Sequence, residues 1–461
     1  MSGNTSPSSS KISKRKLVDD DEDNSITTKK NRSDEDSSIS SISFALKTGY
    51  FYFVKVSSVL ECFNENCFSL KDVLNFVMPE ESLHFNFMIE VDWLIENFRQ
   101  YPESCRQTPI NLVVGEKMGS DAASLRRDIK LLKLDNIQVS GAHLPIPYGT
   151  HHTKLSLLKV KDELHIIVST ANLVKGDWQE KTQMFYYCKA KLENGEGNQS
   201  CNFQNDLSEY LKMYNLPIVA PWIKYIEHAD FGDNNDHFIY SCPGYHKKPT
   251  KDKMAQLGLR NALKERTLDP NALYIAQCSS IGSLGQKPDQ WFLSQFLNSL
   301  RGGRTKGSTR VYLVYPTIQD VQHSYEGYSA GGSLPYQSKT HEKQTWLRAH
   351  LCKWRSDKRG RNKAMPHVKS YCEIGADREL KWLLITSANL SKAAWGEIQK
   401  NGEQLAVRSW EAGVLVQDPS RCGLPYDYPI CRYKDGDQPW IVDKNYKDFD
   451  SHGRQWIYDQ Q

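Results

Sequence analysis

Two copies of one short pattern limit what this chain can fold into more than any other feature of its sequence. Each copy has a His-x-Lys motif, then an apolar run, then an asparagine six positions before a tryptophan. Lysine and asparagine are 18 positions apart in the first copy and 20 in the second. An internal repeat of this kind predicts two similarly folded halves. The residues are His152, Lys154 and Asn172, then His367, Lys369 and Asn389.

The segments between these motifs predict an α/β fold. Short apolar runs at 50–56, 110–114, 165–168 and 310–315 are typical of strands. Apolar residues within 206–214 recur at helical spacing, and a second helix of this kind is expected at 345–354. Because each face of a sheet needs a helical layer to bury it, we expect two α-β-α sandwich domains.

Chain length sets the expected domain organisation. A chain of 461 residues exceeds one comfortable core, so we expect domains at 44–232 and 233–461, each with one half-site. A pseudo-twofold axis would relate the two domains and place the active site at their interface. Since one chain supplies both half-sites, we expect a monomer. No apolar run is long enough to span a membrane, and we do not expect the protein to bind a membrane surface.

Residues 1–43 differ from the rest of the chain. They contain no aromatic residue, many serines and mixed charges, which predicts a disordered tail. Basic clusters at 14–16 and 29–32 have the two-part spacing that nuclear import receptors read, so we expect a nuclear protein. The alternative is a solvated tail, because five acidic residues at 19–23 nearly balance these charges.

The residue types of the repeat suit chemistry at a phosphodiester. In an extended strand, residues two apart point to the same face, so the histidine and lysine of each motif form half a site. Two facing half-sites offer two imidazoles, two ammonium groups and two carboxamides to a negatively charged transition state. Carboxylate clusters for magnesium, an H-E-x-x-H motif and a P-loop are absent from the sequence. We therefore expect no metal and no cofactor.

Two histidines can take opposite roles near neutral pH. With a reference pKa of about 6.5, one imidazole can be neutral and nucleophilic while the other is protonated. We expect the first to attack phosphorus and form a covalent phosphohistidine. The second would protonate the leaving oxygen and then activate water. A lone histidine would more often be structural, but the repeated set favours catalysis.

Five further strings of the sequence are distinctive: GTHHTK at 149–154, DWQEKTQ at 177–183, SSIGSLG at 279–285, EGYSAGGSLPY at 326–336 and SANLSKAAWG at 387–396. Through these strings the chain, from about residue 44 to its end, resembles the tyrosyl-DNA phosphodiesterase family of the phospholipase D superfamily. Most superfamily members carry an aspartate five positions after the motif lysine. Lys159 and Ile374 stand there instead, as expected of the tyrosyl-DNA branch rather than the lipases.

The resemblance implies a role for each site residue. His152 would be the nucleophile, and His367 the general acid and then base. Gln183 and Glu411 would orient the histidines, with the pairing left open; for Glu411 the alternative is a surface salt bridge. The implied phosphate ligands are Lys154, Lys369, Asn172 and Asn389.

The resemblance also implies contacts to DNA. Six basic residues within 353–363 could follow a single strand or form a solvated loop. Tyr328 and Tyr336 could stack on bases or close the core. The serines that match phosphate-contacting positions are Ser279, Ser280, Ser283 and Ser391.

The implied substrate is a DNA 3′ end, single-stranded or duplex, whose phosphate is joined to a topoisomerase tyrosine or another blocking group. One alternative is a lipid or non-specific nuclease activity on the same scaffold, which the missing aspartates disfavour. The other is a non-catalytic DNA-binding homologue, which the intact two-copy set of residues disfavours.

Overall fold

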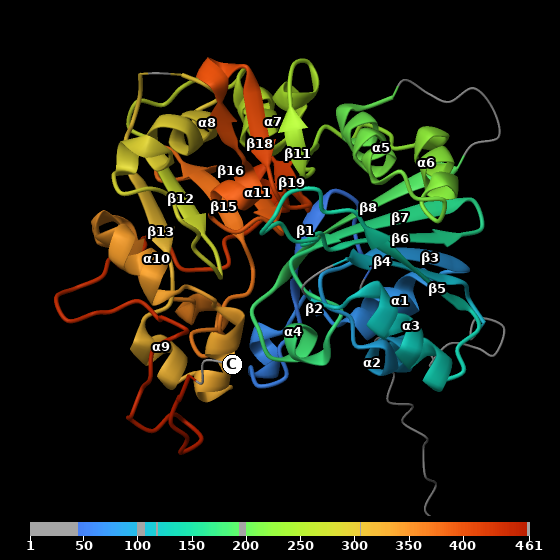
Figure 1. The fold of residues 1–461 in the computed structure, drawn as a ribbon, viewed down its shortest axis with the longest axis horizontal. Helices are drawn as coiled ribbons and strands as arrows, with labels where there is room; N and C mark the ends of the chain where they lie inside the picture. The colour runs from blue at the N-terminus through green and yellow to red at the C-terminus, as the bar shows by residue number, and fades with distance from the viewer. Residues whose placement is uncertain (1–44, 99–106, 117–118, 193–199, 305, 459–461) are drawn as a thin grey trace, which may run out of the picture. The chain divides into compact units, whose positions relative to one another are not determined.

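The computed structural model describes residues 45–98, 107–116, 119–192, 200–304 and 306–458. The predicted disordered tail and its basic clusters lie outside these residues. Ala45–Gln461 forms one compact unit built on two large sheets (Figure 1). In the described part of the chain, no helix has the length and apolar character needed to cross a lipid bilayer.

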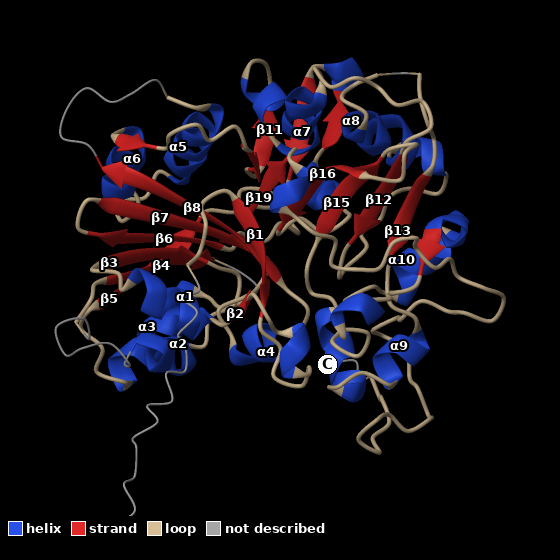
Figure 2. Ribbon diagram, turned by 180° about the vertical axis from the view of Figure 1, so that it is seen from behind, coloured by secondary structure: helices blue, strands red, loops and turns tan. Residues whose placement is uncertain are grey.

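The first sheet is built from residues 50–230, and α-helices cover both of its faces. Figure 2 shows α1, α2 and α3 on one side of the strands and α5 and α6 on the other. The helices are α1 (Leu70–Val77), α2 (Val91–Phe98), α3 (Ala122–Leu131), α4 (Lys175–Gln179), α5 (Asn202–Tyr214) and α6 (Ala220–Glu227). The strand order is β2 (Cys67–Phe68), β1 (Tyr50–Val54), β8 (Met184–Leu192), β7 (Glu163–Ser169), β6 (Leu155–Val160), β3 (Glu81–Phe85), β4 (Ile110–Gly115), β5 (Ile137–Ala142), with β9 (Ala229–Asp230) beside β8.

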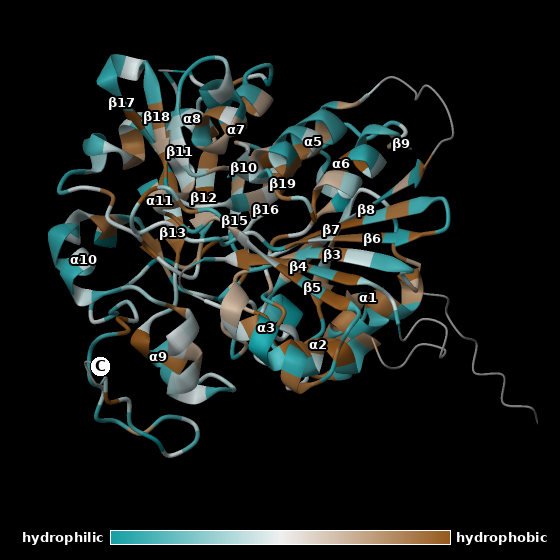
Figure 3. Ribbon diagram, turned by 45° about the vertical axis from the view of Figure 1, so that its right-hand side comes forward, coloured by the Kyte–Doolittle hydropathy of each residue, from teal (hydrophilic) through white to brown (hydrophobic). Residues whose placement is uncertain are grey.

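Local sequence explains where several of these helices begin and which face they bury. A capping box of Ser69 and Asp72 starts α1, and Asp121 accepts two backbone N–H groups at the start of α3. In α5 the predicted apolar stripe is buried, including Leu207 and Tyr214. Figure 3 shows mixed hydrophilic and hydrophobic residues on α3 and α5, as expected for helices with one face on a core.

The second sheet is built from residues 237–416. Its strand order is β10 (His237–Ser241), β19 (Glu411–Val416), β16 (Leu380–Thr386), β15 (Ser370–Ile374), β12 (Leu273–Gln277), β13 (Val311–Val314) and β14 (Leu351–Cys352). A small third sheet holds β11 (Gly244–His246), β18 (Gln404–Val407) and β17 (Glu397–Gln399). The helices of this half are α7 (Ala255–Leu263), α8 (Asn298–Leu300), α9 (Ile318–Gln322), α10 (Ser338–Lys343) and α11 (Lys392–Trp395).

The two large sheets repeat one topology. The series β1-β8-β7-β6-β3-β4-β5 matches β10-β19-β16-β15-β12-β13-β14 strand for strand. Pairing directions also match: four antiparallel pairs are followed by two parallel pairs in both series. The predicted repeat and α/β fold class are therefore confirmed. No strand of either large sheet crosses the expected boundary at 232/233, which itself remains a prediction.

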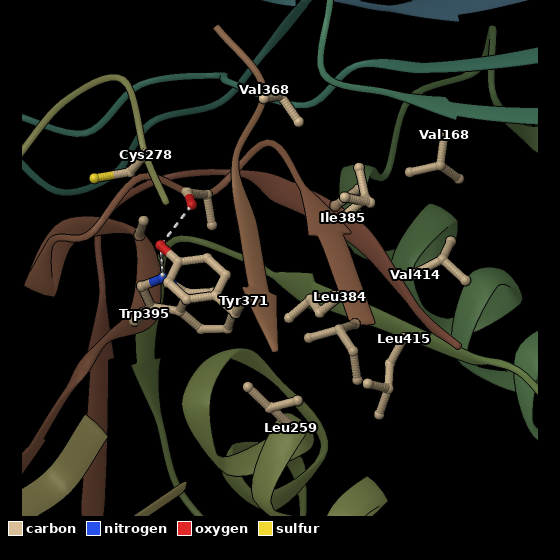
Figure 4. Packing of buried hydrophobic residues seen from close by; sticks show 14 of the residues in the cluster. Val168, Leu259, Cys278, Val368, Tyr371, Leu384, Ile385, Trp395, Val414 and Leu415 are labelled. Carbon is tan, nitrogen blue, oxygen red and sulfur yellow. Dashed lines mark hydrogen bonds between the residues drawn. The ribbon is translucent and has the colours of Figure 1, made fainter. Parts of the chain in front are cut away.

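A continuous apolar core joins the halves. The rings of Tyr214, from α5, and Trp410, just before β19, stack with centroids 4.0 Å apart. In Figure 4, Leu259 of α7 lies against the same core as Leu384 and Leu415 of the second sheet. This shared core holds the motifs of the two halves in a fixed relation.

The helix expected at 345–354 is wrong. The structure has a short 3-10 helix at Thr345–His350, followed by β14 and then Trp354. β14 pairs in parallel with β13, with Leu351 beside Leu313. The apolar residues of the pattern are still buried, Leu347 in the 3-10 helix and Leu351 in the edge strand β14, rather than along one face of an α-helix, so tertiary contacts override the local periodicity.

Candidate active site

Both His-x-Lys motifs lie in extended segments that lead directly into central strands. His152 and Lys154 precede β6, and His367 and Lys369 precede β15. The lysine ammonium of each motif donates to the carbonyl oxygen of its own histidine; the Lys154 Nζ to His152 O distance is 2.9 Å. Each lysine is thereby fixed beside its histidine, as the repeat predicts.

Each histidine segment is hydrogen-bonded to the opposite half of the molecule. His152 N donates to Trp410 O at 3.0 Å, and Trp410 is followed by Glu411. His367 N donates to Thr182 O at 3.1 Å, and Thr182 is followed by Gln183. The arrangement is the same in both directions. It brings Glu411, which begins β19, against the histidine of the first half, and Gln183, which directly precedes β8, against the histidine of the second half.

Glu411 contacts His152. His152 Nδ1 lies 3.0 Å from Glu411 Oε2, which also accepts a hydrogen bond from Ser387 Oγ at 2.5 Å. Glu411 is only 4% exposed, so the alternative of a surface salt bridge is excluded. Burial lowers the pKa of His152, the Lys154 charge lowers it further, and Glu411 opposes both effects. A neutral His152 that donates from Nδ1 keeps the lone pair of Nε2 for a substrate.

Gln183 contacts His367. The Gln183 amide nitrogen lies 2.8 Å from His367 Nδ1, and its amide oxygen accepts from Thr170 Oγ1 at 2.7 Å. Asp177 Oδ2 also lies 3.1 Å from the same Nδ1. Burial lowers the pKa of His367 to about 3, against the opposing effect of the Asp177 charge. The sequence left the pairing of Gln183 and Glu411 open; the structure pairs each with the histidine of the opposite half.

The two asparagines follow β7 and β16 by three residues, and each is held by its own half. Asn389 Oδ1 accepts from Ser279 N, Ser280 N and Ser279 Oγ at 2.9–3.2 Å, which leaves its amide nitrogen as a donor. Figure 4 shows Tyr371 hydrogen-bonded to Trp395. The Tyr371 hydroxyl also donates to the backbone oxygen of Ala388, directly before Asn389. Asn172 is held differently, since its backbone N and its Nδ2 both donate to Asp177 Oδ2.

Two buried ammonium groups make the site suited to an anion. Burial lowers the pKa of Lys154 to about 8, with Glu411 and Asp177 opposing. Burial also lowers the pKa of Lys369, and the charge of Lys154 adds to that effect. Because buried charges need partners, a negatively charged phosphodiester between the lysines would replace part of the lost hydration.

The serine positions divide into different environments. Ser279 is 1% exposed, and its hydroxyl is used by Asn389, so it positions that residue. Ser391 accepts from Ala394 N as the N-cap of α11, and Gly282 N donates to Leu390 O beside it. Ser283 is exposed and Ser280 half-exposed. The serine loop therefore packs on the Asn389 turn, with Ser280 and Ser283 closest to solvent.

Several of the basic residues at 353–363 pair with acidic residues of the protein or are buried in it. Lys353 pairs with Asp437 and Arg355 with Asp320, both at 2.7 Å. Arg361 is 1% exposed and donates to Val54 O. Lys358 and Lys363 remain exposed. The hypothesis that all six residues follow a DNA strand is therefore wrong.

The stacking hypothesis for two tyrosines is also wrong. Tyr328 is 2% exposed and stacks on Trp440, and Tyr336 is fully buried. Their rings have no surface to offer a base, so they close the core.

Sequence reasoning missed three supporting residues. Thr170 and Ser387 occupy equivalent places in the repeat, each two positions before its asparagine, and each donates to the orienting side chain of its own half. Asp177 has Ala394 as its counterpart, since each lies five positions after its asparagine. An alignment of the two copies could have shown both the shared hydroxyl and the unshared carboxylate.

Gly149 allows the two half-sites to approach each other. A Cβ at this position would stand 1.9 Å from the carbonyl oxygen of Arg408, beside the strand that carries Glu411. We expect Gly149→Ala to lower the free energy of unfolding by about 1–3 kcal/mol, measured by thermal unfolding. Gly332→Ala is the control, because its Cβ would meet nothing within 4 Å. Equal stability of the two variants would contradict the close approach.

Comparisons with known proteins agree with this geometry. A family model described as tyrosyl-DNA phosphodiesterase matches residues 51–440. A probable tyrosyl-DNA phosphodiesterase of Caenorhabditis elegans is 43% identical over 430 residues, covering 89% of this chain and 93% of that protein. Tyrosyl-DNA phosphodiesterase 1 of Drosophila melanogaster is 30% identical over 406 residues, covering 79% and 68%. The crystal structure of the yeast tyrosyl-DNA phosphodiesterase superposes with a TM-score of 0.68 at 23% identity, covering 86% and 99%.

Proposed function

This chain belongs to the tyrosyl-DNA phosphodiesterase family, and we propose that it hydrolyses the bond between a DNA 3′ phosphate and a tyrosine through a covalent intermediate on His152. The observation that carries this mechanism is the crossed pairing of the half-sites. Each imidazole is oriented through Nδ1 by the opposite half, so both Nε2 atoms are left for reaction. The same geometry suits other 3′ blocking groups that leave as weakly basic anions.

The first step is attack by His152 on phosphorus. Nδ1–H donates to Glu411, which stabilises the positive charge that the ring gains as Nε2 forms its bond to phosphorus. The bond from phosphorus to the tyrosine oxygen breaks, and His367 donates its Nε2 proton to that oxygen. The products are free tyrosine and a phosphohistidine linked to the DNA 3′ end.

The second step is hydrolysis of the phosphohistidine. His367, now neutral, takes a proton from water through Nε2 as the water oxygen attacks phosphorus. The bond from phosphorus to His152 breaks, and the DNA leaves with a 3′ phosphate. His152 is the nucleophile in the first step and the leaving group in the second, and His367 transfers the proton in both steps.

The four ligands of the repeat stabilise the non-bridging oxygens. The ammonium groups of Lys154 and Lys369 supply two positive charges in a site shielded from water, where such charges act strongly. The carboxamides of Asn172 and Asn389 add hydrogen-bond donors. This set supports a reaction without a metal ion, since it supplies the charge stabilisation that a metal would. Among the described residues, no three His, Cys, Asp or Glu side chains are grouped to hold a metal.

The pKa shifts predict the pH profile of kcat/KM. His152 must be neutral to attack, and burial lowers its pKa below the usual 6.5, so activity should persist below pH 6.5. Lys154 must be charged to bind phosphate, and its pKa is lowered to about 8, so kcat/KM should fall as pH rises through about 8. Steady-state rates from pH 5 to 10 on an oligonucleotide 3′-(4-nitrophenyl) phosphate, whose phenolate leaves without a proton from His367, test this. A profile flat above pH 8, or an acid limb above 6.5, would contradict it.

A gel assay tests the function. The substrate is a single-stranded oligonucleotide with a 3′-phosphotyrosine, incubated with the protein in excess EDTA. Conversion to a 3′-phosphate end is the expected result. An inert protein, or activity lost on chelation, would contradict the metal-independent mechanism. Lipid turnover would favour the phospholipase alternative, and DNA binding without conversion would favour a non-catalytic homologue. Light scattering of the same preparation tests the proposed monomer.

A further inference from the structure

Asp177 breaks the symmetry between the half-sites. It lies five positions after Asn172, whereas the equivalent position after Asn389 is Ala394. Its side chain is buried, with 4% exposure, and one oxygen, Oδ2, makes three contacts. Asn172 N lies at 2.7 Å, Asn172 Nδ2 at 2.9 Å and His367 Nδ1 at 3.1 Å. A buried carboxylate that the repeat does not require needs a specific explanation.

The tautomer that His367 needs for catalysis explains the buried Asp177 carboxylate. To act as a base, His367 needs a lone pair on Nε2, and its remaining proton must then sit on Nδ1. In the structure the Gln183 amide nitrogen faces Nδ1 at 2.8 Å, which suits a ring without that proton. A protonated Nδ1 requires an acceptor instead, and the Asp177 carboxylate lies at hydrogen-bond distance.

Gln183 can adapt to a protonated Nδ1. If its carboxamide turns over, Oε1 faces His367 and Nε2 donates to Thr170 Oγ1. Thr170 can then donate to Met184 O, 3.1 Å away. Every polar group in this set keeps a partner after the turn. The amide is therefore compatible with both tautomers, whereas the carboxylate stabilises only the one that carries the proton on Nδ1.

We propose that Asp177 is the positioning residue that holds the proton of His367 on Nδ1, so that Nε2 alone exchanges a proton with the leaving group and then with water. This inference rests on the proposed function. Glu411 performs the corresponding task for His152, which explains why the second half has alanine at the equivalent position.

The other charges around His367 oppose its protonation or lie beyond contact. Lys369 and Lys154 both disfavour the imidazolium, and Asp177 is the carboxylate that favours it. Lys181 acts on Asp177 from the same half and pairs with Glu326 at 2.7 Å. Removing the charge of Asp177 should therefore leave His367 with two cations and no counter-ion.

Substrates that differ in their leaving group separate this role from a structural one. One oligonucleotide carries a 3′-phosphotyrosine, and the other a 3′-(4-nitrophenyl) phosphate, whose phenolate leaves without help from an acid. Single-turnover rates are measured for wild type, Asp177→Asn and Asp177→Glu. Asp177→Asn should lose about 100-fold on the tyrosyl substrate and less than about tenfold on the nitrophenyl substrate. Asp177→Glu should recover part of the loss.

Two control experiments distinguish a failure of this inference from a failure of the proposed function. In a His367→Ala background, Asp177→Asn should lower the tyrosyl rate by less than about threefold, because the two residues act as one unit. Glu326→Gln removes a nearby carboxylate that does not contact His367, and it should leave the ratio of the two substrate rates unchanged. Equal losses on both substrates, or additive losses in the double variant, would overturn the inference while leaving the function intact. A wild type inert on both substrates would overturn the function itself.

Discussion

His152→Ala is expected to lower the rate of tyrosine release by on the order of 10⁴-fold or more, because it removes the atom that bonds to phosphorus. Binding of the oligonucleotide should change little, since the two lysines and two asparagines remain in place. The measurement is the single-turnover rate on the 3′-phosphotyrosine oligonucleotide, together with its Kd.

A matched control is His143→Ala. The His143 side chain is 73% exposed and pairs with Glu116 outside the site, so its removal tests the loss of a histidine as such. Thermal unfolding should show both variants folded. If His152→Ala retained a rate within about tenfold of wild type, water would be the direct nucleophile, and the covalent mechanism would be wrong.

Replacing His367 should stop the reaction between its two steps. Phenolate is a moderate leaving group, with a conjugate acid pKa of about 10, so tyrosine can depart slowly without a proton donor. Attack by water has no such substitute for the missing base. His367→Ala is therefore expected to accumulate protein joined to DNA, seen as a labelled band of low mobility on a denaturing gel.

Loss of His367 should therefore slow the second step more than the first. Tyrosine should appear in a burst of up to one equivalent per enzyme, followed by turnover slower than wild type by on the order of 10²–10⁴-fold. A variant that releases tyrosine slowly, with no burst and no adduct, would place the role of His367 in the first step alone.

Much of the site could be predicted because its central residues occur in two copies of one sequence pattern. A repeat of His-x-Lys and asparagine constrains two elements at once, and the two His-x-Lys motifs lie in equivalent places directly before β6 and β15. Strand segments such as 110–114 and 165–168 were also predictable, since their apolar runs are buried inside a sheet.

The pairing of site residues across the two halves could not be predicted, because it depends on contacts between segments that are distant in the sequence. The pairing of Gln183 with His367 joins residues 184 positions apart, and the pairing of Glu411 with His152 joins residues 259 apart. Neither follows from local pattern. The basic run at 353–363 shows the same limit, because acidic partners such as Asp320 and Asp437 come from other parts of the chain. Counting basic residues in the sequence therefore overestimates how many of them are free to contact DNA.

The most direct test of the mechanism is to locate the covalent bond. His367→Ala is reacted with the 3′-phosphotyrosine oligonucleotide and digested with nuclease and protease at neutral or alkaline pH, where phosphohistidine survives. Peptide mass spectrometry then finds the modified residue. The mechanism predicts a phosphorylated nucleotide remnant on His152, and no adduct in the His152→Ala, His367→Ala double variant. A remnant on another residue, or an adduct that persists in the double variant, would contradict it.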